Sequence, residues 1–427
     1  MKRYSIERAN AWIDNFKTRF NWFDKTVSSW KFLNYIVFIV ILLKKFKKVF
    51  IPFFLLLISV AFSSCENEED YQEIKDRTVI VYMLANNNLY SDALNNINEM
   101  ESVWNNLSNG NLVVIIEHRS GGKKLELIEI KNDNNTKYIS SPTVTIYEDK
   151  DAINPLDMNY IINDVIQKYP SRKYSLILWS HATGWLPPNT ILRSFGESDN
   201  VEMDIHDLAR SIPSNLFDVL IFDACNMGSI EILYELKEKA NYIVASPTEI
   251  LAKGFPYSLI IPSFFENDID AVSIGKTFFD YYDQQMGEYR SATIGVVKTS
   301  ELKFLAQKTK ELICNAELSQ SLYERLNYVQ FYDRYQNKIF FDFKQVIECI
   351  DVSNNNLFPS FLTQLEKAVI YSAHTNIFLN QYEIKNCSGL SCFIPNKMHS
   401  STIKNYYKTL SWYNDSGFDK LFGFNLD

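Results

Sequence analysis

The 427-residue chain predicts an α/β fold in which a mostly parallel sheet is flanked by helices and followed by a helical C-terminal elaboration. Short runs of β-branched and aromatic residues recur along the chain, and such continuous apolar runs are typical of strands buried on both faces. Segments with helical spacing separate these runs, as in βαβ units with parallel strands. No internal repeat or low-complexity tract interrupts the part from residue 77 onward.

The first half of this body contains most of the predicted elements. Residues 78–84 are the clearest strand, and Ser91 can cap the helix that follows. Pro170 ends another helix, since proline has no backbone N–H to donate. The expected strands are 78–84, 112–116, 125–130 at an edge of the sheet, 176–179, 219–222 and 242–246. The expected helices are 91–107, 157–169, 204–211 and 228–240.

The second half alternates longer helices with strands at residues 293–297 and 390–393. Charge is unevenly distributed along the whole chain. Residues 1–64 carry 11 Lys/Arg and 3 Asp/Glu, which leaves 32 basic and 48 acidic residues in the rest. An acidic body repels phosphate backbones, so we expect no nucleic-acid partner. Six cysteines are too few for a disulfide scaffold.

The N-terminal region reads as an export signal. Its apolar runs, residues 32–43 and 49–62, are shorter than the roughly 20 residues that span a membrane. A basic cluster at 44–48 precedes the second run, which is the order found in secretory signals. Small residues then lead to Cys65, which resembles the lipidated cysteine of bacterial lipoproteins. The alternative is a buried helix that ends in an ordinary cysteine.

This interpretation divides the chain into four parts. Residues 1–43 are either an N-terminal extension or the result of a mis-assigned translation start. Residues 44–65 are the lipoprotein-type signal and residues 66–76 a tether. Residues 77–427 are the functional domain. We therefore expect the protein in the cell envelope, lipid-anchored to a bacterial membrane. The acidic residues after Cys65 resemble a surface-export signal and favour an outward-facing position.

Two predicted strands end in residues that can carry chemistry. His181 follows strand 176–179, and Cys225 follows strand 219–222. Carboxyl ends of parallel strands meet at one edge of a sheet, where ligands bind. A thiolate is a strong nucleophile, and an imidazole can take its proton and return it to a leaving amine. The predicted helix after Cys225 also favours the thiolate through its partial positive charge. Taken alone, a cysteine at such a position is more often a small buried thiol, and a histidine is more often a hydrogen-bond donor within a loop. Together, the two residues predict a reaction site.

The local sequences around these residues resemble the clostripain family of cysteine peptidases, which has a caspase-like α/β fold. L-I-L-W-S-H-A-T-G-W at 176–185 matches its histidine motif, and D-A-C-N-M-G-S-I-E at 223–231 its nucleophile motif. The match continues at 244–249, 254–257 and 388–395. The resemblance implies a cysteine endopeptidase with protein or peptide substrates. It assigns Cys225 as the nucleophile and His181 as the general base and acid.

The resemblance also implies the remaining parts of the site. Backbone N–H groups of Cys225 and Ala182 would hold the oxyanion, and Asp223 would bind a basic P1 side chain, so that cleavage follows Arg or Lys. Relatives are often matured by self-cleavage between His and Cys, which makes Arg193 a possible processing site. No cofactor is required; calcium dependence occurs in some relatives, but no metal-binding motif is present.

The chain departs from the family around the histidine. Ser180 replaces the usual acidic residue, and Ala182 and Thr183 replace glycines. Ala182 offers an N–H only if its backbone does not need a positive φ. The alternative function is therefore a catalytically weakened scaffold that binds peptides or partners at the cell surface.

Other possible sites are less specific. Asp204, His206 and Asp207 do not share one helical face, so we expect a solvated helix start rather than a metal site. The remaining histidines have no partner motif, and the remaining cysteines lack C-x-x-C spacing and are expected as buried thiols or a disulfide. These residues are His118, His374, His399, Cys314, Cys349, Cys387 and Cys392.

Overall fold

The structure is a computed structural model that describes residues 31, 34–40, 73–105, 109–119, 124–187, 195–198, 201–266, 268–316, 324–325, 327–350 and 357–423. The chain forms two compact units, Met1–Tyr71 and Gln72–Asp427. In the first unit, residues 34–40 are helical. Within the ranges given above, no helix is both long enough and apolar enough to cross a membrane.

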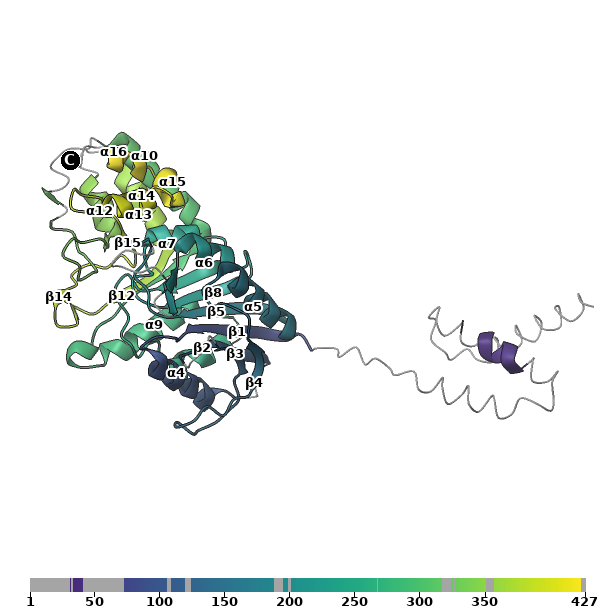
Figure 1. The fold of residues 1–427 in the computed structure, drawn as a ribbon. Coiled ribbons are helices and arrows are strands. Elements are labelled where there is room, and N and C mark those ends of the chain that lie inside the picture. Colours follow the sequence, from purple (N-terminus) through teal and green to yellow (C-terminus); the bar gives the residue numbers. More distant parts are fainter. Residues whose placement is uncertain are drawn as a thin grey trace, which may run out of the picture. The chain divides into compact units, whose positions relative to one another are not determined.

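The second unit is built around a nine-stranded sheet with the order β12-β10-β9-β8-β5-β1-β2-β3-β4. Figure 1 shows its part from β8 through β5 and β1 to β2. Its centre, from β9 to β2, is parallel, and the strands on either side are antiparallel. The predicted mostly parallel sheet is therefore confirmed. The strands are β1 (Lys75–Leu84), β2 (Gly110–His118), β3 (Lys124–Glu129), β4 (Thr143–Tyr147), β5 (Ser171–Trp179), β8 (Phe217–Asp223), β9 (Ala240–Ala245), β10 (Thr293–Lys298) and β12 (Val369–His374).

Both faces of the sheet are covered. Along β1, Ile80, Tyr82 and Leu84 enter one hydrophobic cluster, and the alternate residues enter the other. This explains why the strand is apolar without interruption. The helices are α4 (Tyr90–Val103), α5 (Pro155–Lys168), α6 (Ile205–Ser211), α7 (Ile230–Glu235), α8 (Tyr257–Phe264), α9 (Ala271–Asp283), α10 (Leu302–Asn315), α12 (Phe343–Ile350), α13 (Leu357–Ala368), α14 (Ser401–Tyr407), α15 (Ser411–Asp415) and α16 (Phe418–Gly423).

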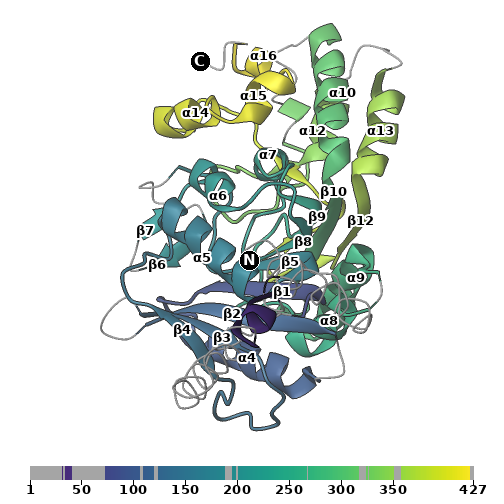
Figure 2. The ribbon, with the colours of Figure 1, turned by 90° about the vertical axis from the view of Figure 1, so that its right-hand side faces the viewer.

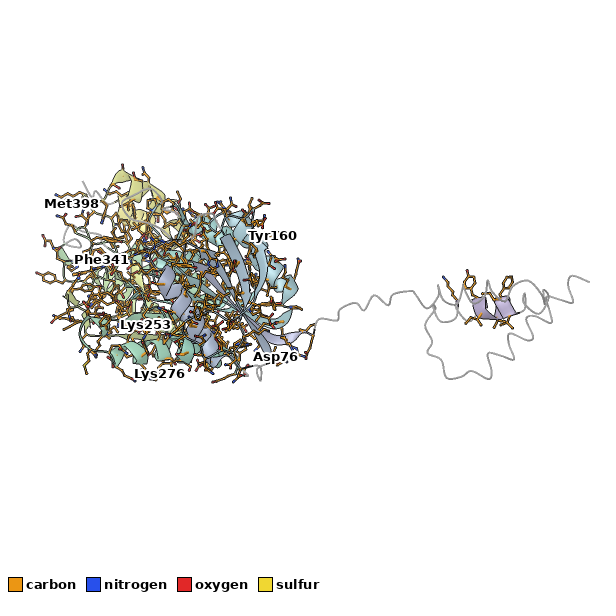
Figure 3. All side chains as sticks on the ribbon, turned by 60° about the horizontal axis from the view of Figure 1, so that its bottom comes forward. Asp76, Tyr160, Lys253, Lys276, Phe341 and Met398 are labelled. Carbon is orange, nitrogen blue, oxygen red and sulfur yellow. The ribbon has the colours of Figure 1, made fainter. Side chains whose placement is uncertain are left out.

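The C-terminal helices gather beyond one end of the sheet. Figure 2 shows α10 and α12 to α16 together past β10 and β12. This part is the predicted helical elaboration, and its residues join one of the two hydrophobic clusters. The outside carries both charged and large apolar side chains, for example the exposed Lys276, Tyr160 and Met398 (Figure 3). Smaller hairpins join β6 (Phe195–Ser198) to β7 (Val201–Met203) and β13 (Ile377–Phe378) to β14 (Tyr382–Glu383).

Three sequence-based expectations about the sheet are wrong. The strand predicted at 125–130 is not at the edge, because β4 pairs outside it. Residues 390–393 contribute only the two-residue β15 (Ser391–Cys392), which pairs with β11 (Phe341–Asp342) outside the main sheet. The opposite edge strand, β12, was missed because its short apolar run directly follows helix α13, and periodicity alone does not separate the two.

Candidate active site

The carboxyl ends of three neighbouring strands lie in register. Trp179 of β5 is paired with Met83 of β1 on one side and with Asp223 of β8 on the other. His181 and Cys225 each come two residues after the Trp179–Asp223 pair. The prediction that the two residues leave the sheet at one edge is confirmed.

The histidine loop is tied to its neighbouring strands. Ser180 donates from its hydroxyl to the Leu84 carbonyl at 3.2 Å and from its N–H to the Asp223 carbonyl at 3.3 Å. The carbonyl of His181 accepts from Gly196 N–H at 2.9 Å. The imidazole is half-buried, and its Nε2 lies 2.7 Å from Oδ1 of Asn88. An amide oxygen only accepts, so Nε2 carries the proton and Nδ1 is left as the basic nitrogen.

Asn88 is the site residue that sequence reasoning missed. It lies in the turn after β1, the strand next to β5. Buried Asn87 organises this turn: its amide donates to the Leu84 carbonyl at 2.9 Å and accepts from Leu89 N–H at 2.9 Å. The only signal in the sequence is the run of three asparagines, residues 86–88, at a strand exit.

The turn that carries Cys225 is bonded to the exit of the next strand, β9. Asn226, with φ +57°, donates to the Thr248 carbonyl at 2.8 Å, and Gly228 donates to the Ser246 carbonyl at 2.8 Å. The Cys225 thiol meets both backbone groups of Ile250. It accepts from the N–H at 3.3 Å and donates to the carbonyl at 3.6 Å.

The structure corrects the expected electrostatics of the thiol. Helix α7 begins only at Ile230 and is capped by Ser229, so its N-terminus does not adjoin Cys225. Burial raises the pKa of the Cys225 thiol to about 12, and the carboxylates of Glu249 and Asp223 act in the same direction. The thiol of the free site is therefore protonated, and a base must take its proton before it can attack.

The two loops also pack on one another. A Cβ placed on Gly184 would lie 3.2 Å from the Asn226 carbonyl oxygen and 2.5 Å from the ring of Phe340. Gly184 has φ +83°, so glycine suits this position on both counts. Ala182 is not among the described residues with positive φ, so the replacement of glycine there is sterically tolerated. Ala182 is buried and bridges Phe195 of β6.

Asp223 comes two residues before Cys225, at the end of β8, and is 4% exposed. Its Oδ2 accepts from Phe255 N–H at 3.0 Å and from the Tyr257 hydroxyl at 2.9 Å. A Cβ on Gly254 would lie 2.5 Å from the same oxygen, so only glycine fits against the carboxylate. Burial raises the pKa of Asp223 to about 7 although both donors lower it, and the Glu99 carboxylate adds to the rise.

The other predicted residues do not join this site. Cys65 and Arg193 lie outside the described residues. Asp204 caps α6 by accepting from Asp207 N–H, as expected, and His206 contacts Thr409. Within the described ranges, no group of three His, Cys, Asp or Glu side chains could hold a metal ion. All cysteines in the described part of the chain are free thiols: Cys225, Cys314, Cys349, Cys387 and Cys392.

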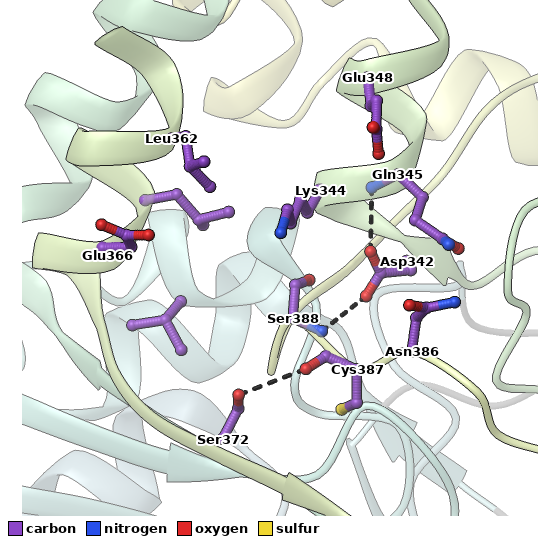
Figure 4. Close-up of a pocket in the computed structure, with 12 residues that line it drawn as sticks. Asp342, Lys344, Gln345, Glu348, Leu362, Glu366, Ser372, Asn386, Cys387 and Ser388 are labelled. Carbon is purple, nitrogen blue, oxygen red and sulfur yellow. Dashed lines mark hydrogen bonds between the residues drawn. The ribbon is translucent and has the colours of Figure 1, made fainter. Parts of the chain in front are cut away.

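The remaining histidines have structural contacts. His118 lies against Tyr90 and Glu126, and His374 contacts the Thr375 carbonyl. A separate pocket of about 290 Å³ lies between α12, α13 and β12 (Figure 4). Its Asp342 carboxylate accepts from the N–H groups of Gln345 and Ser388. Neither His181 nor Cys225 lines this pocket.

Comparison with known proteins agrees with this arrangement. The profile of the clostripain family matches residues 81–423. Clostripain of Hathewaya histolytica is 25% identical over 438 residues, which cover 82% of this chain and 81% of clostripain. Among solved structures, a secreted C11 cysteine protease of Bacteroides thetaiotaomicron, iotapain, superposes with a TM-score of 0.69 at 25% identity, covering 81% of this chain and 99% of that one.

Two further structures extend the comparison. The Bacteroides thetaiotaomicron protease in complex with an irreversible peptide inhibitor gives a TM-score of 0.68 at 26% identity and covers 81% of this chain and 100% of that one. An inactive zymogen of a C11 protease from Parabacteroides distasonis gives a TM-score of 0.67 at 28% identity and covers 81% of this chain and 99% of that one. The caspase-like fold is thereby confirmed. The chain belongs to the clostripain family and is a cysteine-type endopeptidase.

Proposed function

We propose that this chain hydrolyses peptide bonds after Arg, or less readily Lys, with Cys225 as the nucleophile and His181 as the general base and acid. The observation that carries the proposal is the register of β5 and β8, which brings both residues to one edge of the sheet on loops that touch. The match to cysteine proteases over most of the chain supports it.

Cys225, His181 and one water molecule account for every proton transfer and every bond change of the proposed hydrolysis. Nδ1 of His181 takes the thiol proton, Sγ attacks the scissile carbonyl carbon, and the oxyanion accepts from N–H groups of Cys225 and Ala182. The imidazolium then returns the proton to the leaving amine, which leaves a thioester on Cys225. Water, deprotonated by His181, attacks this thioester and releases the acid and the free thiol.

Asn88 orients the base in this scheme. Its Oδ1 accepts from Nε2–H at 2.7 Å and so holds the tautomer in which Nδ1 is the acceptor. The same hydrogen bond strengthens when His181 becomes imidazolium, because a charged donor bonds more strongly than a neutral one.

A buried carboxylate next to the nucleophile supports the preference for basic residues. The donors to Asp223 are a backbone N–H and a phenol, both neutral, so its charge is not compensated by them. An Arg or Lys side chain of the substrate would supply the missing positive charge. Truncation of Asp223 is expected to lower turnover of basic substrates selectively, and equal losses on neutral peptides would contradict this assignment.

The principal test compares the wild type with Cys225→Ala on a fluorogenic peptide that ends in Arg. We expect turnover by the wild type and background rates for the variant. If both proteins behave alike, the catalytic assignment is wrong.

The substitutions at Ser180, Ala182 and Thr183 and the raised pKa of the thiol favour a second candidate, a weakened scaffold that binds peptides. An arginyl electrophile that captures thiolates separates the two. Modification of Cys225 indicates the peptidase, whereas an unmodified Cys225 together with measurable peptide binding indicates the scaffold.

Lipid anchoring at Cys65 and self-cleavage after Arg193 belong to the same proposal. The charge-then-apolar order before Cys65 supports the anchor, and Cys65→Ala should release the protein from membranes in fractionation. Gly196 N–H donates to the His181 carbonyl, so strand β6 (Phe195–Ser198) lies beside the backbone of His181. An intact chain by mass spectrometry after long incubation of active enzyme would exclude self-cleavage.

A further inference from the structure

We propose that Arg334, which comes from the C-terminal part of the chain, is a positioning residue of the active site: its ion pair with Glu249 cancels a carboxylate charge beside the Cys225 thiol and keeps the thiol reactive. The proposal rests on the proposed role of Cys225 as the nucleophile. It assigns a catalytic contribution to a segment that lies 109 positions beyond Cys225 in the sequence.

The ion pair is bidentate and close. Nη2 of Arg334 lies 2.6 Å from Oε2 and 2.9 Å from Oε1 of Glu249, and Nε lies 3.2 Å from Oε1. Glu249 directly precedes Ile250, whose N–H and carbonyl both contact the thiol. The guanidinium is therefore bound to the residue next to the one that holds the sulfur.

The loop that carries Arg334 is rigidly built. Residues 332–340, here called the Asp333 loop, close where Tyr332 N–H donates to the Phe340 carbonyl at 2.8 Å. The Asp333 carboxylate is 2% exposed and accepts from the N–H groups of Tyr335, Ile339 and Phe340 at 2.8–2.9 Å. Arg334 is thus presented by a preorganised turn and not by a free surface strand.

The Asp333 loop also reaches the histidine side. The ring of Phe340 packs so tightly against Gly184 that a Cβ there would lie 2.5 Å from it. One loop therefore contacts the loop after β5, which carries His181, through Phe340, and the segment after β9, whose Ile250 holds the thiol, through Arg334.

The charges around the thiol give Arg334 its effect. The charges that act on the Cys225 thiol are the carboxylates of Glu249 and Asp223 and the guanidinium of Arg334. The thiol is also coupled to the phenol of Tyr335, and His181 lies on the neighbouring strand exit. Both carboxylates oppose ionisation of the thiol, and Arg334 favours it. Without Arg334, the negative charge of Glu249 would oppose ionisation of the Cys225 thiol and no positive charge would compensate it.

The test measures the rate of Cys225 alkylation by iodoacetamide against pH, which needs no substrate recognition and no peptidase activity. The variants are Arg334→Gln, Glu249→Gln, the double variant and Arg334→Lys, with modification mapped to Cys225 by mass spectrometry. Arg290→Gln is the matched control, because Arg290 forms an ion pair of similar exposure with Asp283 away from the site.

We expect Arg334→Gln to slow alkylation about 3- to 10-fold at pH 7.5 and to move the profile to higher pH, a range that allows for the partial exposure of the guanidinium. Arg334→Lys should retain part of the rate, Glu249→Gln should equal or exceed the wild type, and the double variant should recover to within about 3-fold of it. The control should match the wild type.

Two results would overturn the inference. One is an alkylation profile of Arg334→Gln that overlaps the wild type, and the other is a double variant as slow as Arg334→Gln, since loss of the contact rather than of charge balance would then explain both. Melting curves of all variants establish that they are folded. If the expected pattern is found but no peptide is cleaved, the proposed function fails while this inference stands.

Discussion

At the residue scale, the contact between Asn88 and His181 determines which ring nitrogen of the proposed base carries the proton. A histidine at a strand exit can present either ring nitrogen to the thiol, and its partner on the other side selects which. Here that partner is a neutral amide, not the carboxylate found in many catalytic triads. The hydrogen bond to Asn88 therefore stabilises the imidazolium through an amide dipole and not through a full negative charge.

Replacing Asn88 should test this orientation. We expect Asn88→Ala to lower kcat about 10- to 100-fold with little change in KM, the range for a lost hydrogen bond to a charged group. Asn88→Asp should move the acidic limb of the pH–rate profile to higher pH, because a carboxylate favours the imidazolium. Asn315→Ala, on the far helix α10, is the control and should leave kcat unchanged. An unchanged kcat in Asn88→Ala would remove the assigned role.

As the proposed partner of a basic P1 side chain, Asp223 should make recognition of basic residues dependent on pH. Its pKa is raised to about 7 in the free site, so the carboxylate is protonated below that pH and a guanidinium loses its partner. We expect KM for an arginyl peptide to rise about tenfold between pH 7.5 and 6, whereas KM for a peptide with a neutral P1 residue stays level. Steady-state kinetics on both peptides measure this, and parallel pH profiles would contradict it.

At the element scale, the strand exits are held by loops from elsewhere in the chain. The exits of β5, β8 and β9 are cross-bonded by Ser180, Asn226 and Gly228. The Asp333 loop then packs over them, so its own stability limits the precision of the site. Its buried carboxylate satisfies three backbone N–H groups that would otherwise lose their partners.

Asp333→Ala should therefore be strongly destabilising. Leaving buried N–H groups unsatisfied costs about 1–3 kcal/mol for each group, so we expect a loss of about 2–4 kcal/mol after relaxation, together with reduced activity. Denaturant unfolding measures the free energy. Asp280→Ala, which breaks an exposed ion pair with Lys276 on α9, should change it by less than about 1 kcal/mol. Equal effects of the two variants would show that the carboxylate does not support the loop.

At the scale of the whole molecule, the C-terminal part is hydrogen-bonded directly to the segment after Cys225. Ser391 N–H donates to the Gly228 carbonyl at 2.9 Å. Glu231 of α7 is fully buried, and its Oε1 accepts from Phe393 N–H at 2.8 Å and from the Tyr407 hydroxyl at 2.9 Å. The turn that carries Cys225, helix α7 and the C-terminal helices are therefore joined by buried hydrogen bonds.

Glu231 should also make the stability of this structure depend on pH. Burial raises its pKa to about 7, above the ordinary value of 4.5, so the folded state binds a proton that the unfolded state has released. The contribution of Glu231 to the free energy of unfolding is therefore lost as pH rises from about 4.5 to 7. We expect the melting temperature of the wild type to fall relative to Glu231→Gln between pH 5 and 8. A constant difference, or the same trend in the exposed control Glu383→Gln, would contradict this.

Much of this protein follows from the sequence by itself. Continuous apolar runs predict the central strands, since a strand buried on both faces needs no alternation. The residues directly after those runs predict His181 and Cys225 at one edge of the sheet, because parallel strands share a direction. Both inferences depend on local patterns, and both are confirmed by the structure.

The rest was decided by tertiary structure. Asn88 and His181 are 93 positions apart, and Arg334 and Glu249 are 85 apart, so no local pattern signals either contact. The outer strand β4, the missed strand β12 and the late start of α7 depend likewise on what packs beside them. Turn, capping and edge positions carry little apolar surface, so their placement follows from the contacts that the assembled core provides and not from the sequence around them.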